Sequence, residues 1–266
     1  MTATRLGVLG WPVVHSRSPQ MQNAALVAAG LDDWRFQLLP VPPELFEETV
    51  RALPAAGFAG ASVTVPHKEA ALALADRASD SAREIGAANT LIFGGDGEIA
   101  AENTDAPGFL RALGAAPAAG STALVLGAGG SSRAVTWALR EAGVQVRVWN
   151  RNPERARALA GDLGVEAVPE PGPADLLVNC TVAGMEGDPF DDLPFAPADL
   201  GEYPTVVDLV YADGEGRLLK AAREVGARTV DGLEILVAQG AIAFELWTGR
   251  EADVPAMAAA ARAAAA

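Results

Sequence analysis

The chain has 266 residues, 50% of them hydrophobic, which is enough to bury the core of one large domain or of two modest ones. Its formal net charge of −14 argues against a nucleic-acid partner, because phosphate backbones are bound by clustered lysines and arginines. A small anionic ligand would therefore have to be held by a local group of basic side chains and backbone N–H groups.

Cysteine and hydropathy set the expected compartment. Cys180 is the only cysteine, so no intramolecular disulfide can form, as is usual in a reducing cytoplasm. We find no signal-peptide pattern and no apolar run long enough to span a bilayer. No spacing of His, Cys and Asp indicates a metal site. We expect a cytoplasmic protein with no membrane and no metal partner.

Short apolar runs alternate with helical patterns along the first half, which is typical of β–α units around a mostly parallel sheet. We expect strands at residues 5–10, 35–41, 60–65 and 90–93, and helices at residues 19–30, 43–53, 68–75 and 80–87. Pro19 and Pro43 suit the first turn of a helix, where no N–H is needed.

The pattern restarts in the second half, after a Pro/Gly-containing junction at residues 115–120. We expect strands at residues 122–126, 144–149, 175–180 and 205–209, with Cys180 as a small buried strand residue. Helices are expected at residues 131–142, 154–163, 231–247 and 255–262. The chain therefore predicts two α/β domains without internal repeats.

The most specific motif is the glycine-rich loop Gly127-Ala128-Gly129-Gly130-Ser131-Ser132-Arg133. It follows an apolar strand and opens a helix, which is the context of a dinucleotide-binding turn. The glycines permit a tight turn and close approach of a pyrophosphate, to which the N–H groups of Gly130 and Ser131 would point. Ser132 replaces the third glycine of the usual pattern, so the match is imperfect.

The residues after the next strand indicate which dinucleotide is bound. NAD-binding folds usually carry Asp or Glu there, to hold the ribose 2′-OH. This chain has Asn150-Arg151-Asn152, followed by Arg155. Guanidinium groups bind a 2′-phosphate by bidentate hydrogen bonds, which favours NADP.

Polar residues in the first half gather at predicted element boundaries. Ser16 and Ser18 precede Pro19 at a helix start, an arrangement that suits a small carboxylate but also plain helix capping by Ser18. Ser62 and Thr64 share one face of a strand that Pro66 ends, with Lys68 opening the next helix. Taken singly, each of these groups is explained by turn structure as readily as by ligand binding.

In series, however, these motifs resemble the shikimate dehydrogenase family over residues 6 to 249. The resemblance rests on Ser16-x-Ser18, Val63-Thr64-Val65-Pro66-x-Lys68, Asn89-Thr90, Asn103-Thr104-Asp105, the glycine loop, Asn150-Arg151, Asn179-x-Thr181, Gly184-Met185, Tyr211, and Asp231-Gly232 with Gln239. It implies two open α/β domains with a central cleft: a substrate domain (residues 1–104 and 234–266) and a Rossmann-like NADP domain (residues 105–233).

The implied activity is reversible hydride transfer between NADPH and the ketone of 3-dehydroshikimate, giving shikimate, in aromatic amino-acid (chorismate) biosynthesis. Lys68 and Asp105 would flank the reacting carbonyl, as catalytic residues. By resemblance, the substrate would be bound by Ser16, Ser18, Thr64, Asn89, Tyr211 and Gln239. The cofactor would be bound by Gly127, Ala128, Gly129, Gly130, Ser131, Asn150, Arg151, Arg155, Thr181, Leu209 and Gly232. The oligomeric state is left open, with a homodimer as one expectation.

The chemistry agrees with this assignment. Hydride addition builds negative charge on the ketone oxygen, so a proton donor must lie within hydrogen-bond reach. Lysine can release a proton whereas arginine cannot, and this chain, which otherwise uses arginine, has lysine only at positions 68 and 220. His15 and His67 adjoin the motifs and are weaker candidates.

The sequence departs from the family at three places. Ser62 stands where the family usually has Asn, Val182 follows Thr181 in place of Ser, and the residues after Tyr211 lack the usual Asn-Pro turn.

Two alternative functions are considered: a quinate/shikimate dehydrogenase, and a non-catalytic NADP-binding sensor that kept the fold. The Ser16-x-Ser18 pair favours shikimate, because relatives that use quinate tend to carry Thr at one of these serines.

Overall fold

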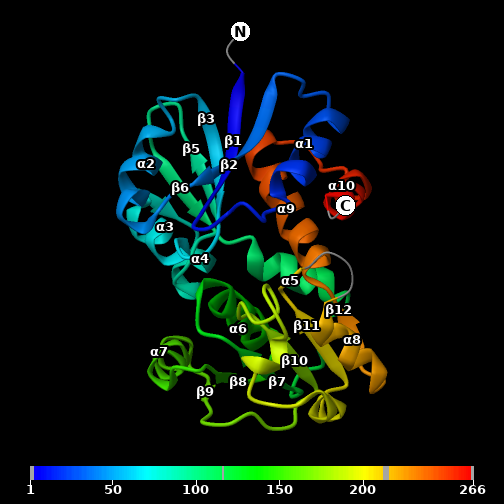
Figure 1. Ribbon diagram of the computed structural model, residues 1–266. Coiled ribbons are helices and arrows are strands. Elements are labelled where there is room, and N and C mark those ends of the chain that lie inside the picture. Colours follow the sequence, from blue (N-terminus) through cyan, green and yellow to red (C-terminus); the bar gives the residue numbers. More distant parts are fainter. Residues whose placement is uncertain (1–2, 116, 212–215, 265–266) are drawn as a thin grey trace. The chain divides into compact units, whose positions relative to one another are not determined.

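The computed structural model describes residues 3–115, 117–211 and 216–264. The chain folds as two compact units (Figure 1). The first comprises the residues up to Gly108 together with Leu236–Ala264, and the second comprises Phe109–Ile235. None of the described helices is both long and apolar enough to cross a membrane.

The first unit is built on a six-stranded sheet with the order β2-β1-β3-β5-β6-β4. Its strands are β1 (Thr4–Gly10), β2 (Trp34–Pro40), β3 (Phe58–Val63), β4 (Arg77–Ala78), β5 (Thr90–Phe93) and β6 (Ile99–Glu102). Strand β1 pairs in parallel with β2 and β3, whereas β5 runs antiparallel to both β3 and β6. The sheet is therefore mixed, with its parallel part at the β1 side.

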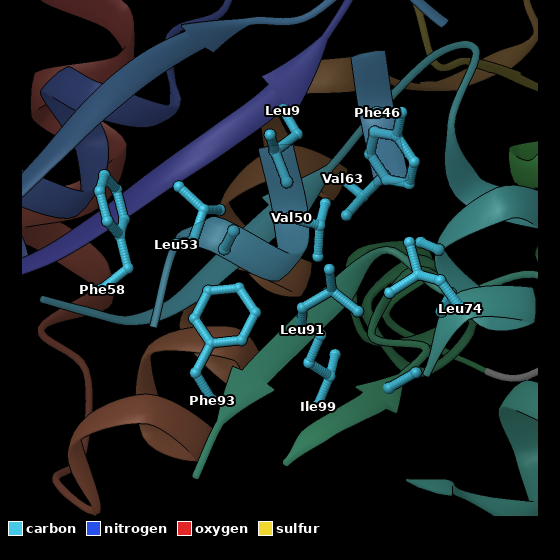
Figure 2. Packing of buried hydrophobic residues seen from close by; sticks show 14 of the residues in the cluster. Leu9, Phe46, Val50, Leu53, Phe58, Val63, Leu74, Leu91, Phe93 and Ile99 are labelled. Carbon is cyan, nitrogen blue, oxygen red and sulfur yellow. The ribbon is translucent and has the colours of Figure 1, made fainter. Parts of the chain in front are cut away.

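Helices cover both faces of this sheet (Figure 1). The helices of this unit are α1 (Ser18–Ala28), α2 (Phe46–Ala52), α3 (Lys68–Leu74), α4 (Asp80–Ile85), α5 (Asp105–Leu113), α9 (Gly232–Thr248) and α10 (Val254–Ala263), of which α5 and α9 cross the unit boundary. Figure 2 shows the cluster in which Phe46 and Val50 of α2 meet Leu9, Val63 and Leu91 of the sheet. Burial of these apolar side chains fixes α2 and α3 on one face.

On the other face, α9 packs directly against the sheet. The indole N–H of Trp247 donates to the carbonyl of Leu91 (2.9 Å), and the Trp247 ring also contacts Phe36. A Cβ at residue 60 would lie 2.3 Å from that indole nitrogen, so only glycine allows this approach. Helix α9 is thereby held on the first unit, although it follows the strands of the second unit in sequence.

The second unit contains a wholly parallel six-stranded sheet with the order β12-β11-β10-β7-β8-β9. Its strands are β7 (Thr122–Leu126), β8 (Gln145–Trp149), β9 (Glu166–Ala167), β10 (Leu176–Asn179), β11 (Thr205–Asp208) and β12 (Arg228–Val230). Its helices are α6 (Gly130–Glu141), α7 (Pro153–Leu163) and α8 (Arg217–Glu224). This order matches a doubly wound dinucleotide-binding fold, in which ligands bind at the carboxyl edge of the strands.

The expected elements are present, with boundaries shifted by one or two residues. The expected helix at residues 43–53 is instead a 3₁₀ turn (Pro43–Leu45) followed by α2. Several short strands and the helices α5 and α8 were not expected, because their apolar runs are too short or irregular to show a period. Cys180 follows the end of β10 and is only half-buried, so its placement as a buried strand residue was wrong.

Candidate active site

Lys68 and Asp105 form an ion pair in the first unit. Strand β3 ends at Val63, and the chain passes Pro66 before Lys68 opens α3; Asp105 opens α5. The Lys68 Nζ lies 2.5 Å from the Asp105 Oδ2, and their side chains are 9% and 15% exposed. Both side chains are largely removed from water, so loss of either partner would leave an uncompensated buried charge.

Asn89 connects this pair to its neighbours. Its Nδ2 donates to Asp105 Oδ1 (2.8 Å), Thr104 Oγ1 (2.9 Å) and Gln239 Oε1 (3.2 Å). Its Oδ1 accepts the backbone N–H of Thr104 (2.7 Å). We refer to Lys68, Asn89, Thr104, Asp105 and Gln239 as the polar cluster. Each side chain in it is hydrogen-bonded, so its geometry is fixed before any ligand arrives.

Local structure explains why these residues meet. Asn103 accepts the N–H of Ala106 at the start of α5 and donates to the Ala87 carbonyl, which ties α5 to the segment before β5. A Cβ at residue 108 would lie 2.6 Å from the Cβ of Gln239, so Gly108 lets α5 and α9 touch. Thr104, which the sequence analysis did not select, bonds both Asn89 and Gln239, in addition to the direct bond between those two side chains.

Of the other residues expected to bind substrate, Thr64 directly follows β3, and Ser16 and Ser18 lie between β1 and α1 and at the start of α1, respectively. Thr64 is half-buried, and its Cγ2 lies 2.4 Å from where a Cβ of Gly10 would stand. Ser16 Oγ accepts the N–H of Ser18 (3.3 Å), while the cap position of α1 is Arg17 and makes no side-chain cap bond. Capping of α1 by Ser18 is therefore not what the structure shows.

His67 is structural. Its ring stacks on Phe46 at a centroid distance of 4.3 Å, and its Nε2 donates to the Val41 carbonyl (2.7 Å). Burial lowers the pKa of His67, against the smaller opposing effect of this bond. The neutral ring anchors the start of α3 immediately before Lys68. His15, by contrast, is exposed.

The glycine loop lies in the second unit between β7 and α6. Gly127 has φ +111, and a Cβ there would lie 2.8 Å from Ser132 Oγ and 3.1 Å from the Cys180 carbonyl oxygen. Gly129 holds the cap position of α6, so no side chain occupies the start of this helix. Ala128, Gly130 and Ser131 complete the loop, and the first N–H groups of a helix started in this way suit a pyrophosphate.

The residues expected to select NADP follow β8. Asn152 caps α7, accepting the N–H groups of Glu154 and Arg155, and Asn150 Nδ2 donates to the Asn152 carbonyl (2.9 Å). Arg151 is 81% exposed and pairs with Asp192 at 3.1 Å. Arg155 is exposed on the first turn of α7. Both guanidinium groups are therefore accessible to a phosphate.

A third group of residues surrounds the ends of β10 and β11. Thr181 Oγ1 donates to Asn179 Oδ1 (2.7 Å), and the Leu209 carbonyl oxygen lies 2.4 Å from where a Cβ of Gly232 would stand. Sequence reasoning missed Asp208, whose buried carboxyl accepts from Asn179 Nδ2 (2.9 Å). An acidic residue inside the apolar run at residues 205–209 was the signal that could have revealed it.

The expected site residues thus divide between the two units. Ser16, Ser18, Thr64, the catalytic pair, Asn89 and Gln239 belong to the first unit, and the expected cofactor residues belong to the second. Tyr211 also belongs to the second unit and is half-buried. The unusual turn expected after Tyr211, at residues 212–215, lies outside the described residues.

Three family models match successive parts of the chain. The shikimate dehydrogenase substrate-binding domain matches residues 8–91, the shikimate/quinate 5-dehydrogenase model matches residues 112–172, and the shikimate 5′-dehydrogenase C-terminal domain matches residues 232–262. Together they include the glycine loop, Lys68, Asn89 and Gln239, but the stretches carrying Asp105 and Asp208 lie between the matches.

Individual relatives agree with the models. The chain is 47% identical to a shikimate dehydrogenase (NADP⁺) of Methylobacterium radiotolerans, over 92% of this chain and 91% of that protein. It is 45% identical to the solved shikimate 5-dehydrogenase of Thermus thermophilus in complex with NADP(H) and shikimate, with a TM-score of 0.86 over 98% and 99% of the two chains.

A solved structure of lower sequence identity is that of a dehydrogenase with a different substrate. The quinate dehydrogenase of Corynebacterium glutamicum, solved with NAD, is 31% identical with a TM-score of 0.84 and covers 97% of this chain and 98% of its own. The identity, coverage and matched domains point the same way as the paired lysine and aspartate and the glycine loop. The chain belongs to the shikimate dehydrogenase family.

Proposed function

We propose that this chain catalyses reversible hydride transfer between NADPH and the ketone of 3-dehydroshikimate, giving shikimate in the synthesis of chorismate and the aromatic amino acids. The observation that carries the proposal is the Lys68–Asp105 pair, at 2.5 Å, held within the polar cluster. The 45% identical protein from Thermus thermophilus, solved with NADP(H) and shikimate, supports the choice of both ligands.

Lys68 acts as general acid in reduction and as general base in oxidation. Bound NADPH supplies the hydride, and the ketone oxygen gains negative charge as the hydride arrives. The Lys68 Nζ donates a proton to that oxygen, while the Asp105 carboxylate orients the amine. Asn89 holds the other carboxylate oxygen of Asp105, so that the pair cannot rotate away from the substrate.

The remaining residues of the first unit bind the substrate. Ser16 and Ser18 hold its carboxylate through hydroxyl and backbone N–H groups, with Tyr211 of the second unit as the third contact. Thr64, Asn89 and Gln239 hold its ring hydroxyls. A site that hydrogen-bonds several hydroxyls discriminates strongly against analogues that lack one, because its buried polar groups would be left unpaired.

The second unit binds NADP. The turn at Gly127 has no room for a side chain, and the start of α6 offers the N–H groups of Gly130 and Ser131 to a pyrophosphate. Ala128 and Gly129 contribute backbone to the same loop. Asn150, Arg151 and Arg155 hold the 2′-phosphate, and Thr181, Leu209 and Gly232 lie toward the nicotinamide.

The domain boundaries and the cellular compartment of the enzyme are also part of the proposal. The substrate domain comprises residues 1–104 and 234–266, and residues 105–233 form the NADP domain. The enzyme works in the cytoplasm, as its single cysteine favours, and does not bind nucleic acid, as its charge of −14 favours. Light scattering of the purified chain would distinguish a homodimer from a monomer.

The test is NADPH formation from shikimate and NADP, repeated with NAD and with quinate. Rapid turnover of shikimate with NADP and slow turnover of the other combinations is the expected result. Preferential turnover of quinate would move the chain to the function of the 31% identical Corynebacterium glutamicum relative. NADP binding without turnover of either acid would instead favour a non-catalytic sensor.

A further inference from the structure

Asp208 is a buried carboxyl group that none of the expected catalytic or binding roles uses. It ends β11, and its partner in the parallel pairing with β10 is Asn179, which ends that strand. Asn179 is 0% exposed and Asp208 is 3% exposed. The Asn179 Nδ2 donates to Asp208 Oδ1 at 2.9 Å, so the two strand ends are joined by side chains as well as by the backbone.

Asn179 transmits this link to the turn after β10. Its Oδ1 accepts both the backbone N–H (3.1 Å) and the hydroxyl (2.7 Å) of Thr181. The Thr181 Oγ1 then accepts the N–H of Ala183 at 3.0 Å. Because the backbone N–H of Thr181 can only donate, the Oδ1 of Asn179 must face Thr181 and its Nδ2 must face Asp208, so Asp208 completes the link that holds Thr181 in place.

The same carboxyl oxygen orders the turn after β11. Asp208 Oδ1 accepts the N–H of Val210 at 3.1 Å, and the N–H of Leu209 donates to the Asn179 carbonyl at 3.0 Å. The Leu209 carbonyl group lies directly against Gly232, where a side chain would clash with it. Thr181 and Val210 are therefore tied to one buried oxygen atom, Thr181 through Asn179, and Leu209, between Asp208 and Val210, packs against Gly232.

We propose that Asp208 is a positioning residue for the nicotinamide side of the cofactor site, which it holds through Asn179 and the N–H of Val210. The inference rests on the proposed function, since Thr181, Leu209 and Gly232 are the residues assigned to that end of NADP. Asp208 does not contact the reacting atoms; it sets the two turns that do the binding.

The charge state of Asp208 adds a second consequence. Its hydrogen-bond donors are neutral, and the charged group that acts on it is the carboxylate of Asp231, which caps α9. Burial, with a smaller contribution from Asp231, raises the pKa of Asp208 to about 7 despite the bonds from Val210 and Asn179. Burial disfavours the charged form more than these bonds favour it, so the arrangement of the two turns is most stable with Asp208 neutral, and ionisation above that pH destabilises it.

The experiment is NADPH binding, followed by protein fluorescence without any substrate, to wild type, Asp208→Ala, Asp208→Asn and Val207→Ala. Val207 lies on the same strand and is fully buried, so Val207→Ala controls for loss of packing in β11. The expected result is about tenfold weaker binding for Asp208→Ala, from loss of the bonds to Asn179 and Val210. Val207→Ala should bind NADPH within about twofold of wild type.

Asp208→Asn keeps an acceptor oxygen but cannot ionise, and it tests the proposal even if Asp208→Ala does not fold. At about pH 6 it should bind NADPH within about twofold of wild type; between about pH 6 and pH 8.5 wild type should weaken about threefold more than the variant. Parallel pH profiles for the two proteins, or normal binding by folded Asp208→Ala, overturn the inference. If wild type does not bind NADPH at all, the proposed function fails first, and this inference with it.

Discussion

The polar cluster of the first unit consists of side chains that hydrogen-bond to one another inside the protein. The groups of the second unit that are expected to bind the cofactor are, by contrast, the backbone N–H groups of the glycine loop and the exposed Arg151 and Arg155. Asn89 holds Asp105, which in turn holds Lys68, so the geometry of the pair exists without a ligand. Arg151, at 81% exposure, can change its partner from Asp192 to a phosphate. Catalysis needs fixed geometry, while binding of a dianion tolerates adjustable side chains.

This difference predicts the largest effect at Lys68. Lys68→Ala should lower kcat by about 10³-fold while changing the KM for shikimate little, because it removes proton transfer in the transition state. Lys68→Arg should not restore kcat, since a guanidinium group does not release its proton. Initial rates of NADPH formation across shikimate concentrations measure both parameters.

Lys220 provides the matched control, being the only other lysine in the sequence and exposed on α8. Lys220→Ala should retain wild-type kcat and KM. A Lys68→Ala enzyme with a raised KM and an intact kcat would reduce Lys68 to a binding residue.

A smaller effect, confined to one cofactor, is expected at the exposed arginines. Replacing Arg151 and Arg155 together by Ala should raise the KM for NADP by about 10²-fold, because two charge-assisted contacts with the 2′-phosphate are lost. The KM for NAD should stay within about twofold. Arg157→Ala, at an exposed position on the same helix, is the control. Equal changes in the KM for NADP and the KM for NAD would show that the two arginines do not bind the 2′-phosphate.

The same contrast explains how much could be predicted from the sequence. The glycine loop and Asn150-Arg151 are proposed to bind through backbone geometry and charge over a few consecutive residues, so local sequence was enough to predict a cofactor site there. Lys68, Asn89, Asp105 and Gln239 are far apart in the chain, and the sequence could only bring them together through family resemblance. The hydrogen bonds among them, and the role of Thr104, are properties of the fold.

Asp208 illustrates the limit of what can be predicted from the sequence. Its position in a short apolar run predicted only a buried strand, and nothing local shows that Asn179, on the neighbouring strand, would meet it. The parallel register that pairs residues 179 and 208 arises from the order of strands in the sheet. An acidic residue in an apolar run marks Asp208 as unusual in the sequence, but its partner is visible only once that order is known.

A third effect, on stability, should follow from the raised pKa of Asp208. The folded protein keeps this carboxyl protonated up to about pH 7, whereas the ordinary pKa in an unfolded chain is 3.8. Between these values the folded state binds more protons, so the contribution of Asp208 to stability falls as pH rises and then levels off. The limiting slope is about 1.4 kcal/mol per pH unit.

Urea unfolding of wild type and Asp208→Asn from about pH 4 to pH 8 measures this slope as a difference. Subtraction removes the other carboxyl groups, including Asp175, whose pKa is lowered by its bonds from Thr122 and which acts in the opposite direction. Wild type should lose stability relative to Asp208→Asn as the pH rises. A constant difference across the range would mean that Asp208 is ionised in the folded state throughout.

The smallest effect is expected at Ser132, which stands where the usual dinucleotide motif has glycine. Its Oγ is buried and has no hydrogen-bond partner among the described residues, as is also true of Thr136 Oγ1 one turn further along α6. Removing an unpaired buried hydroxyl relieves a desolvation cost, so Ser132→Ala and Thr136→Val should each leave stability unchanged or raise it by up to about 1 kcal/mol.

Comparison of the two variants separates packing from binding. Ser132 Oγ lies beside Gly127, 2.8 Å from the position of an added Cβ, whereas Thr136 is further from the loop. If the Ser132 hydroxyl only packs beside Gly127 and does not contact the cofactor, both variants will bind NADPH as wild type does. If it completes its hydrogen bond on the pyrophosphate, Ser132→Ala alone will weaken NADPH binding, by about three- to tenfold. Because this loop otherwise binds through its backbone, we expect equal binding by the two variants.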